Sequence, residues 1–412
     1  MNETVCGKAP CFEGAQLHEP ALSKAPEGAE SNGCRTSGRL NPASAAEGWF
    51  SLLTLTGQRL RRLVDPVRRT THFFRPISVT RSLIVPAILL ASASMAIAQK
   101  PLPRQQMPRN GTLATLVREA NLYANPDDSG GPISDILPGR ELVVAEKNGK
   151  WLRVFANTDA PDTRESDVPV FGSEGEAQPI SGWMLNKGIV DINTPHGDLI
   201  LFGAADDLEQ QADVSNPPPH VAEEARLLYR RIVTMYPDSP WTPEAMYRAA
   251  DIRWQLQKSD ASTLPSAHEK ENYLREQMDE DEMRKVLKYF PGTQWGDLAA
   301  FDLIDNKLCG DWQGSEKCPE QETNYYLKYA DEHPNSPKAA EALYSALWRQ
   351  AAAGDMWAAD GNGKRADEDR GHAKAILDRM QQKYPQSPYT ARAASLVFKI
   401  DQGVPVYGSS RE

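Results

Sequence analysis

The chain has 412 residues, of which 40% are hydrophobic and 25% are charged, and its formal net charge is −10. This composition is typical of a soluble globular protein, and the length suits two or three folded units. Residues 1–98 carry 11 Lys/Arg and 7 Asp/Glu, a net charge of +4 that leaves −14 for residues 99–412. That acidic portion contains no basic stripe, so nucleic acid is not an expected partner.

The segment from residue 75 to residue 98 has the order of a secretory signal peptide. Arg75 and Arg81 precede an apolar run, and small residues lead up to Ala98. This order predicts export with cleavage after Ala98. Because the apolar run is shorter than the ~20 residues that span a bilayer, we expect a periplasmic or secreted protein of the bacterial cell envelope. It would be peripheral to a membrane at most, since no cysteine follows the cleavage point to accept a lipid.

Residues 1–74 show no sustained period of either a helix or a strand. Gly, Ala, Pro and Ser are scattered among charged residues there. We therefore expect a disordered extension, or residues upstream of the true translation start, which Val79 could provide. A cytoplasmic tail on an uncleaved signal anchor is the alternative.

Residues 110–192 predict a small all-β unit. Apolar and polar residues alternate with the period of two that strands show, and turn-rich stretches separate the runs. Strands are expected at residues 112–117, 121–123, 141–145, 151–155 and 181–184. Asn148-Gly149 predicts the centre of a hairpin turn between two of them. About five short strands in so short a stretch indicate a small barrel.

Four short motifs in this stretch match the outline of a known family. They are Leu122-Tyr123-Ala124 with Pro126, Gly139-Arg140-Glu141-Leu142-Val143-Val144, Trp151-Leu152-Arg153-Val154 and Gly182-Trp183-Met184. In these motifs the chain resembles the bacterial SH3-like (SH3b) domain. The resemblance implies a barrel that binds cell-wall peptide or protein ligands, with Tyr123, Trp151 and Trp183 as candidate ligand contacts. Trp151 and Trp183 suit the core of a barrel at least as well, so Tyr123 is the favoured exposed contact.

The stretch between Phe155 and Ile180 departs from that family. About 25 polar, acidic and Pro/Gly-rich residues stand where a tight turn is usual. We expect a surface excursion or a binding loop over residues 157–180. Residues 193–219 are expected to be a linker that ends in Pro217-Pro218-Pro219, with room for one short helix over residues 199–212.

Four prolyl corners recur in the C-terminal half of the chain. They read Tyr236-Pro237-Asp238-Ser239-Pro240, Phe290-Pro291-Gly292-Thr293, His333-Pro334-Asn335-Ser336-Pro337 and Tyr384-Pro385-Gln386-Ser387-Pro388. The first Pro of each is expected to stop a helix, and the Ser or Thr to cap the next one. Helix pairs are predicted at 221–236 with 245–256, 271–289 with 295–308, 320–332 with 338–353, and 369–383 with 389–400, with loops at 259–267 and 360–367.

The corners are 54, 43 and 51 residues apart, whereas a tetratricopeptide repeat takes roughly 34. Residues 220–402 are therefore predicted to be an all-α superhelix of tetratricopeptide-like repeats with longer loops. The sequence of residues 225–250 resembles the envelope subclass of these repeats, which occurs in the outer-membrane assembly lipoprotein BamD and in the Tol-Pal coordinator protein. That resemblance implies a partner-binding role in the envelope. The missing lipid-accepting cysteine and the preceding SH3-like unit depart from BamD.

Two cysteines lie downstream of the predicted signal, Cys309 and Cys318, and they flank a Gly-containing turn. In an oxidising compartment this pair is expected to form a disulfide that staples two helical units. A redox-active pair is the alternative, although such pairs favour Cys-x-x-Cys spacing. Cys6, Cys11 and Cys34 lie upstream of the signal, and Cys6 and Cys11 lack zinc-ligand spacing.

The chain shows no nucleophile elbow, no Gly-rich phosphate loop and no His-x-x-x-His pair. Residues 360–364 begin like a calcium loop, but Lys364 and Arg365 stand where a ligand and Gly belong. We therefore expect no metal, no cofactor and no enzymatic activity. The expected function is that of an exported scaffold that binds an envelope protein or a peptidoglycan peptide. The alternatives are an outer-membrane protein assembly factor, and a cell-wall hydrolase accessory or weak hydrolase.

Overall fold

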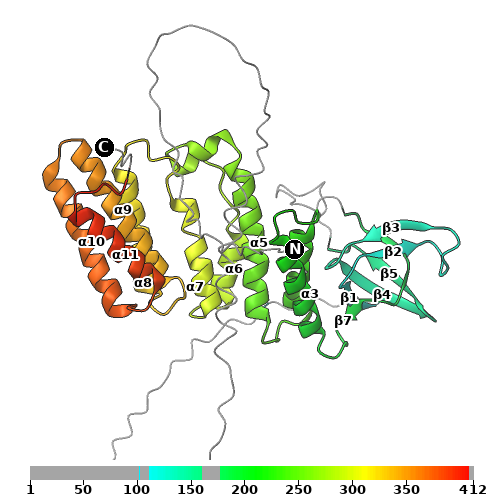
Figure 1. Cartoon of the computed structure of the whole chain (residues 1–412). Helices are drawn as coiled ribbons and strands as arrows, with labels where there is room; N and C mark the ends of the chain where they lie inside the picture. Colours follow the sequence, from blue (N-terminus) through cyan, green and yellow to red (C-terminus); the bar gives the residue numbers. More distant parts are fainter. Residues whose placement is uncertain (1–101, 103–110, 160–176, 408–412) are drawn as a thin grey trace, which may run out of the picture.

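The computed structural model describes residue 102 and residues 111–159 and 177–407, which form an antiparallel sheet followed by an all-α region. The sheet lies at one end of the molecule, and the helices follow from it in chain order (Figure 1). The predictions made for residues 1–98, including the signal peptide and its cleavage site, lie outside the described residues.

Seven strands form a single sheet in the order β3-β2-β6-β5-β4-β1-β7. They are β1 Thr112–Leu116, β2 Ala120–Tyr123, β3 Pro132–Ile136, β4 Glu141–Asn148, β5 Trp151–Ala156, β6 Ile180–Leu185 and β7 Ile189–Asp191. Five of them lie where the alternating pattern predicts strands, whereas β3 and β7 were not predicted. β3 contains Pro132 and is an edge strand, the position in which a missing backbone N–H costs no ladder bond.

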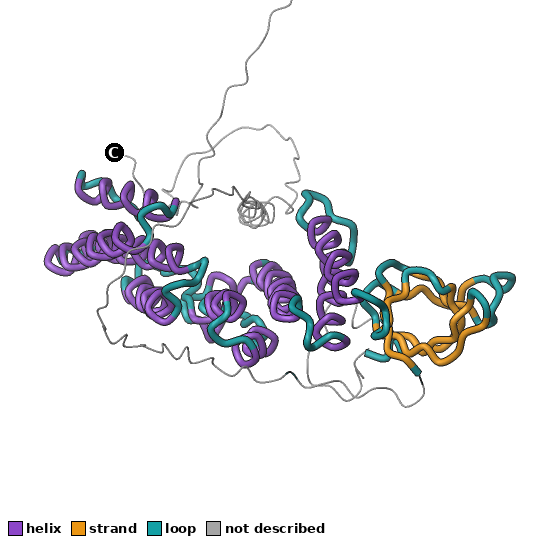
Figure 2. The backbone as a smooth tube through the Cα atoms, turned by 90° about the horizontal axis from the view of Figure 1, so that it is seen from below, coloured by secondary structure: helices purple, strands orange, loops and turns teal. Residues whose placement is uncertain are grey.

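The strands curl around a common interior (Figure 2). Side chains of alternate residues fill that interior, among them Leu122, Leu152, Val154 and Met184. The hairpin between β4 and β5 pairs Asn148 with Trp151, so its two turn residues are Gly149 and Lys150. The predicted centre at Asn148-Gly149 is therefore wrong by one residue. Gly149, with φ of 58°, occupies the first turn position, which a glycine adopts without strain.

Nine α-helices follow within residues 177–407. They are α3 Gly197–Ala212, α4 Val221–Met235, α5 Thr242–Ser262, α6 Asp281–Tyr289, α7 Gln294–Asp302, α8 Lys317–Glu332, α9 Ala339–Ala359, α10 Gly363–Lys383 and α11 Pro388–Asp401. Consecutive helices pack against each other, as the grouping of their buried Leu, Ala and Tyr side chains into shared clusters shows. Within the described residues, no helix is both long and apolar enough to cross a membrane.

The four prolyl corners have one shared backbone geometry. The residue before each first Pro ends a helix with φ between −125° and −132° and ψ between 49° and 57°, and its N–H bonds the carbonyl four residues earlier; these residues are Tyr236, Phe290, His333 and Tyr384. The following Pro disfavours the helical conformation of the residue that precedes it, so each helix stops there. The predicted helix ends are confirmed at all four corners.

The predicted Ser or Thr cap at the start of the next helix is confirmed at two corners. Thr293 and Ser387 each accept a side-chain hydrogen bond as N-cap. At the other two corners Ser239 and Ser336 accept a hydrogen bond from the N–H two residues later, and the helix begins three residues after the serine. Those serines therefore shape the turn rather than cap the helix.

The helix predicted over residues 271–289 is wrong in its first half. Only Asp281–Tyr289 is α-helical, because the backbone of Met278 bonds a side chain instead of a helical neighbour. The Met278 N–H donates to Asn306 Oδ1 at 3.0 Å, and Asn306 Nδ2 donates to the Met278 carbonyl at 2.9 Å. The predicted loops are also shorter than expected, since α5 continues to Ser262 and α10 begins at Gly363.

The segment predicted as a linker contains α3, which packs against both the sheet and α4. Leu201 and Phe202 of α3 share one apolar cluster with Leu113 and Val190 of the sheet and with Leu228 of α4. The Tyr236 hydroxyl adds a hydrogen bond of 2.6 Å to the Asp191 carbonyl. Residues 193–219 thus join the sheet and the helices through a common core instead of separating them.

Candidate functional site

The three candidate aromatic residues lie on one face of the sheet. β2, β6 and β5 are adjacent strands, in which Tyr123 pairs with Trp183 and Trp183 pairs with Arg153. Trp151 pairs with Leu185, two residues beyond Trp183 on the same strand and hence on the same face. Cross-strand partners point to one side of a sheet, so the topology brings together three residues that are spread over 60 positions of the sequence.

This face is the outer one. The interior cluster is formed by Leu122, Leu152 and Met184, each directly next to one of the three aromatic residues. Because neighbours along a strand point to opposite faces, Tyr123, Trp151 and Trp183 point away from that interior. Neither tryptophan therefore belongs to that interior cluster, although Trp151 is itself buried.

The three rings differ in how accessible they are. Trp151 is only 6% exposed to solvent. Tyr123 packs edge-on against it with ring centroids 5.4 Å apart, and Lys150 Nζ lies 5.7 Å from the centre of the Trp151 ring. Tyr123 and Trp183 are partly exposed. Trp151 thus forms a buried support, and Tyr123 and Trp183 offer the surfaces that a ligand could touch.

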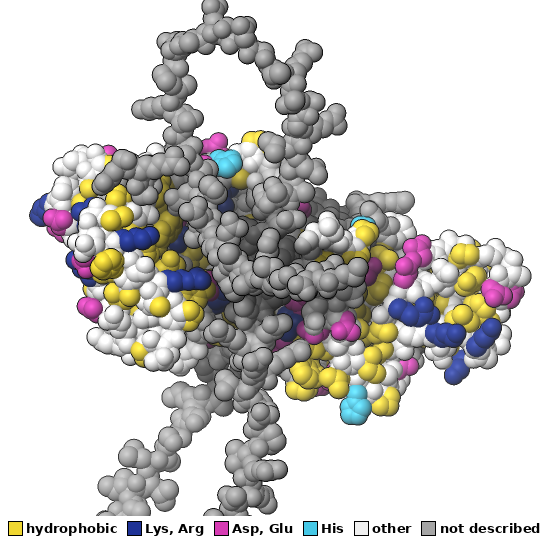
Figure 3. Space-filling model, viewed as in Figure 1, with side chains coloured by type: hydrophobic (Ala, Val, Ile, Leu, Met, Phe, Trp, Pro, Cys, Tyr) yellow, Lys and Arg dark blue, Asp and Glu magenta, His cyan; other side chains and the backbone are white. Residues whose placement is uncertain are grey.

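A cavity of about 360 Å³ opens beside Tyr123. Its lining combines a cation, an anion, an amide and apolar groups: Arg118, Glu119, Ala120, Asn121, Tyr123 and Leu185. Arg118 was not among the predicted site residues, because nothing in its sequence context distinguishes it from a surface arginine. Figure 3 shows Lys and Arg side chains beside hydrophobic ones at the sheet end of the molecule. Such a lining suits a ligand that carries both a carboxylate and an apolar group.

The excursion over residues 157–180 is anchored at both of its ends. Asn157 has a left-handed backbone, with φ of 56°, and its Nδ2 donates to the Gln178 carbonyl at 3.0 Å. Asp159 accepts from the Glu141 N–H at 3.1 Å and from the Arg231 guanidinium at 3.0 Å. Its carboxylate is thus engaged in structural bonds. The other acidic residues of the 157–180 excursion, between positions 160 and 176, lie outside the described residues.

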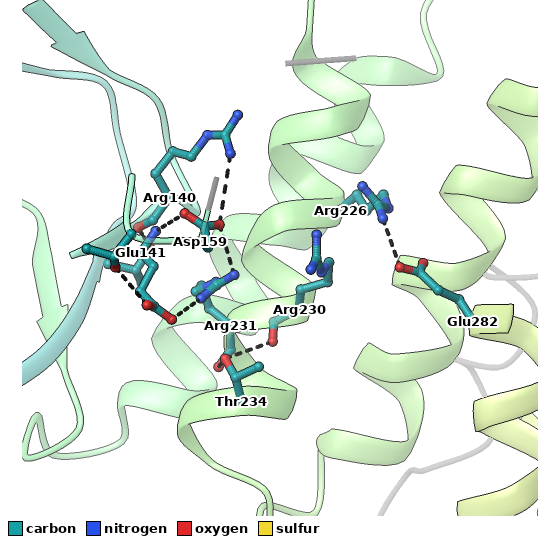
Figure 4. A network of polar contacts seen from close by, with 10 residues as sticks. Arg140, Glu141, Asp159, Arg226, Arg230, Arg231, Thr234 and Glu282 are labelled. Atoms are coloured by element: carbon teal, nitrogen blue, oxygen red, sulfur yellow. Dashed lines mark hydrogen bonds and ion pairs between the residues drawn. The ribbon is translucent and has the colours of Figure 1, made fainter. Parts of the chain in front are cut away.

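A buried ionic network fixes the sheet on α4 (Figure 4). Arg231 of α4 donates to Glu141 Oε2 at 2.8 Å as well as to Asp159 Oδ2, and Arg140 Nη1 lies 4.0 Å from the same Asp159 oxygen. The Thr158 hydroxyl donates to the other Glu141 oxygen at 2.7 Å. All these charged side chains are at most 9% exposed. The sheet is therefore held in a fixed orientation relative to α4.

A second group of charges lies between α5 and α7. Burial raises the pKa of Asp251 to about 6 and raises the pKa of Asp302 well above its usual value, with repulsion from Asp251 adding to the second shift. The Tyr247 hydroxyl donates to Asp302 at 3.0 Å. The nearby cations Lys258 and Lys338 pair with other carboxylates. Burial therefore favours the protonated, uncharged form of both carboxyl groups.

Cys309 and Cys318 form a disulfide in the structure, with their Cα atoms 6.0 Å apart. The buried Glu322 holds the loop that they close. Its Oε1 accepts from the Cys309 N–H at 2.9 Å and from Trp312 Nε1 at 3.1 Å, while Arg349 donates to its Oε2. The disulfide joins the segment that follows α7 to the first turn of α8.

Within the described residues, no group of three or more His, Cys, Asp or Glu side chains could hold a metal ion. The stretch that begins like a calcium loop instead starts α10, where Asn362 Oδ1 accepts from the Arg365 N–H as the N-cap. In comparisons with known proteins, no family model matches the chain and no curated protein matches it significantly. The candidate site therefore rests on its own geometry.

Proposed function

We propose that the protein is an exported, non-enzymatic scaffold of the cell envelope that binds a peptide on the outer face of an SH3-like barrel. The observation that carries this proposal is the gathering of Tyr123, Trp151 and Trp183 on the solvent-facing side of the sheet, next to the cavity lined by Arg118. A rigid aromatic surface beside a cation favours a peptide that bears an apolar side chain and a carboxylate. A peptidoglycan peptide or an acidic loop of an envelope protein has this chemistry.

The helices support a scaffold role in the same proposal. Four corners of equal backbone geometry favour stacked tetratricopeptide-like units, an architecture that presents a long surface to extended partners. The Cys309–Cys318 disulfide favours an oxidising compartment, in agreement with export. The shared core of α3, α4 and the sheet would keep the two binding surfaces in one relative orientation.

Binding of purified protein to cell-wall sacculi and to envelope extract tests the proposal. We expect retention by one of the two, and we expect Tyr123→Ala or Trp183→Ala to weaken it about ten-fold, the typical cost of removing an aromatic contact. Tyr273→Ala is the matched control, because Tyr273 is 74% exposed on a different part of the chain. Retention by neither material would refute the proposal, and so would equal retention of all variants.

The same preparation separates the alternatives. A hydrolase would lower the turbidity of a suspension of purified cell walls, and we expect the turbidity to stay constant. An assembly factor would co-purify with an outer-membrane barrel complex in place of cell-wall material or a peptide-bearing partner.

A further inference from the structure

Basic side chains gather beside the aromatic face of the sheet. Arg153 is the one charged residue of β2, β5 and β6. The turns that follow β1, β4 and β6 add three exposed cations and one exposed anion, which are Arg118, Lys150, Lys187 and Glu119. We call the four cations Arg118, Lys150, Arg153 and Lys187 the basic rim. Positive charge is thus concentrated here in a chain whose formal net charge is −10.

The three turns of the basic rim lie next to one another. The Asn186 N–H donates to the Lys150 carbonyl, and the Val117 N–H donates to the Gly188 carbonyl, each at 2.9 Å. The Arg118 side chain lies along Gly188, where a Cβ would be 3.0–3.2 Å from three of its atoms. Arg118 also lines the cavity beside the aromatic face, so the rim continues into that cavity.

Arg153 places a cation in the same row as two of the aromatic rings. It pairs with Trp183 across β5 and β6, and Trp183 pairs with Tyr123 across β6 and β2. Because neighbouring strands are about 4.8 Å apart, the backbones of Arg153 and Tyr123 are about 10 Å apart. About three residues of an extended peptide cover that distance.

The rim cations lack the carboxylate partners that arginines of the helices have. Arg231 and Arg349 bond carboxylates at 2.8 and 2.6 Å. Among the residues that the structure describes, no cation of the basic rim forms a salt bridge, and Lys150 lies beside the Trp151 ring instead. Neighbouring like charges repel one another, so a bound anion would lower the energy of this surface.

Negative charge lies on the opposite side of the aromatic face. Asp135 of β3 pairs with Asn121, two residues from Tyr123, and therefore shares its face. Asp127 and Asp128 follow in the turn between β2 and β3. A polyanion that crossed the whole face, or a flat anionic lipid surface, would meet these carboxylates. The arrangement favours a ligand whose negative charge is confined to one end.

We propose that the ligand of the aromatic face is a short acidic peptide segment with at least two carboxylates next to an apolar side chain. The apolar side chain contacts Tyr123 and Trp183, and the carboxylates contact the basic rim. This inference rests on the function proposed above and specifies the ligand. The rim selects the charge of the peptide, and the rings provide the apolar contact.

Retention on the material that holds the wild-type protein tests the role of the rim. Lys150→Gln combined with Arg153→Gln should weaken retention about ten-fold, and the fold should persist because both side chains are exposed. Lys328→Gln combined with Lys364→Gln is the matched control, since it changes the net charge equally at side chains that are 73% and 88% exposed on the helices. If Tyr123→Ala weakens retention and the rim variant behaves like the control, the proposed function stands and this inference fails.

Labelled, end-capped tripeptides test the charge requirement directly by fluorescence anisotropy. The sequence Phe-Glu-Glu should bind the wild-type chain at least about ten-fold more tightly than Phe-Gln-Gln or Ala-Glu-Glu does. The rim variant should bind Phe-Glu-Glu and Phe-Gln-Gln equally. Raising the salt concentration from about 0.05 M to about 0.5 M should weaken only the binding of the Glu-containing peptides to the wild type. Equal binding of Phe-Glu-Glu and Phe-Gln-Gln, no binding of any peptide, or tighter binding of phosphatidylglycerol vesicles would overturn the inference.

Discussion

Arg231 on α4 and Glu141 on β4 form a buried ion pair, with Nη1 and Oε2 2.8 Å apart, across 90 residues of sequence. The second Arg231 nitrogen binds Asp159, so one guanidinium compensates two buried carboxylates. The pair connects the sheet that carries the aromatic face to the helical region. Removing one partner of such a network leaves a buried charge without compensation, which is costly.

Arg231→Met is expected to lower the free energy of unfolding by about 3–5 kcal/mol, because the buried Glu141 loses its ion pair with Arg231 and the buried Asp159 keeps only the longer contact with Arg140. Urea denaturation measures the change. Lys364→Ala is the control, since the Lys364 side chain is 88% exposed in its pair with Glu368 and its loss should stay within about 0.5 kcal/mol. A loss at Arg231 as small as that of the control would show that the network does not hold the sheet on α4.

Gly139 is expected to tolerate no side chain. Its φ is +76°, and a Cβ there would lie 2.5 Å from Leu227 Cβ and 2.6 Å from the Leu228 nitrogen on α4. Gly131 has a similar φ of +73° but open space around it. Gly131→Ala should therefore cost about 1 kcal/mol for its backbone alone, and Gly139→Ala clearly more. Thermal unfolding of the two variants separates the steric cost from the backbone cost, and equal losses would contradict the close approach.

Asp251 makes stability depend on pH. Burial raises its pKa in the folded chain to about 6, so its folded form favours the protonated acid. Its contribution to stability is fully present below the ordinary aspartate pKa of about 4 and is lost as pH rises through about 6. We expect Asp251→Asn to increase the free energy of unfolding by about 1 kcal/mol at pH 7.5 and to change it little at pH 4. Urea titrations at both pH values measure this, and an equal effect at both would contradict the assignment.

Two threonines stabilise their corners in the same way. Thr242 donates its hydroxyl hydrogen to the Tyr236 carbonyl, and Thr390 donates to the Tyr384 carbonyl, each at 2.7 Å. Thr→Val at either position keeps the shape and removes the bond, so each should cost about 1 kcal/mol. Thr263→Val is the control, because its hydroxyl bonds an exposed carbonyl at the end of α5. Losses at positions 242 and 390 that differ by more than about 1 kcal/mol would show that the two corners are not energetically equivalent.

Replacing Cys309 and Cys318 by Ser is expected to cost about 2–3 kcal/mol, because a short closed loop loses its constraint on the unfolded chain. Chemical denaturation of the double variant measures the loss. Reduction of the wild-type chain should lower its stability by a similar amount, and reduction of the variant should change nothing. A variant as stable as the oxidised wild type would show that the Glu322 hydrogen bonds alone hold this loop.

The predictions of helix ends and strand positions that the structure confirms rest on local sequence patterns. The helix ends at Tyr236 and its three counterparts follow from the proline at the next position, a restriction that acts over two residues and needs no tertiary context. Strand alternation located β4 and β5 for the same reason. The failures lie where a distant group intervenes. Asn306 bonds the backbone of Met278 and replaces a helix that periodicity alone favours.

The candidate site was predictable in its residue types but not in its arrangement. Tyr123, Trp151 and Trp183 stood out as aromatic residues in strand motifs, yet their common outer face depends on the strand order β2-β6-β5. The cavity beside Tyr123 includes Arg118, whose side chain carries no signal in the sequence. Register decides which neighbours meet, and register is set by pairing between strands far apart in the chain.

The amino-acid sequence by itself determined the division into strands and helices and the places where the helices stop, because alternation, helical period and proline sterics act between near neighbours. Only the tertiary structure decided that the sheet and α4 share a buried ionic network, that the segment predicted as a linker joins them, and that the basic rim lies beside the aromatic face. Burial of opposite charges and of apolar surface depends on which distant groups the fold brings together, and no local pattern encodes that choice.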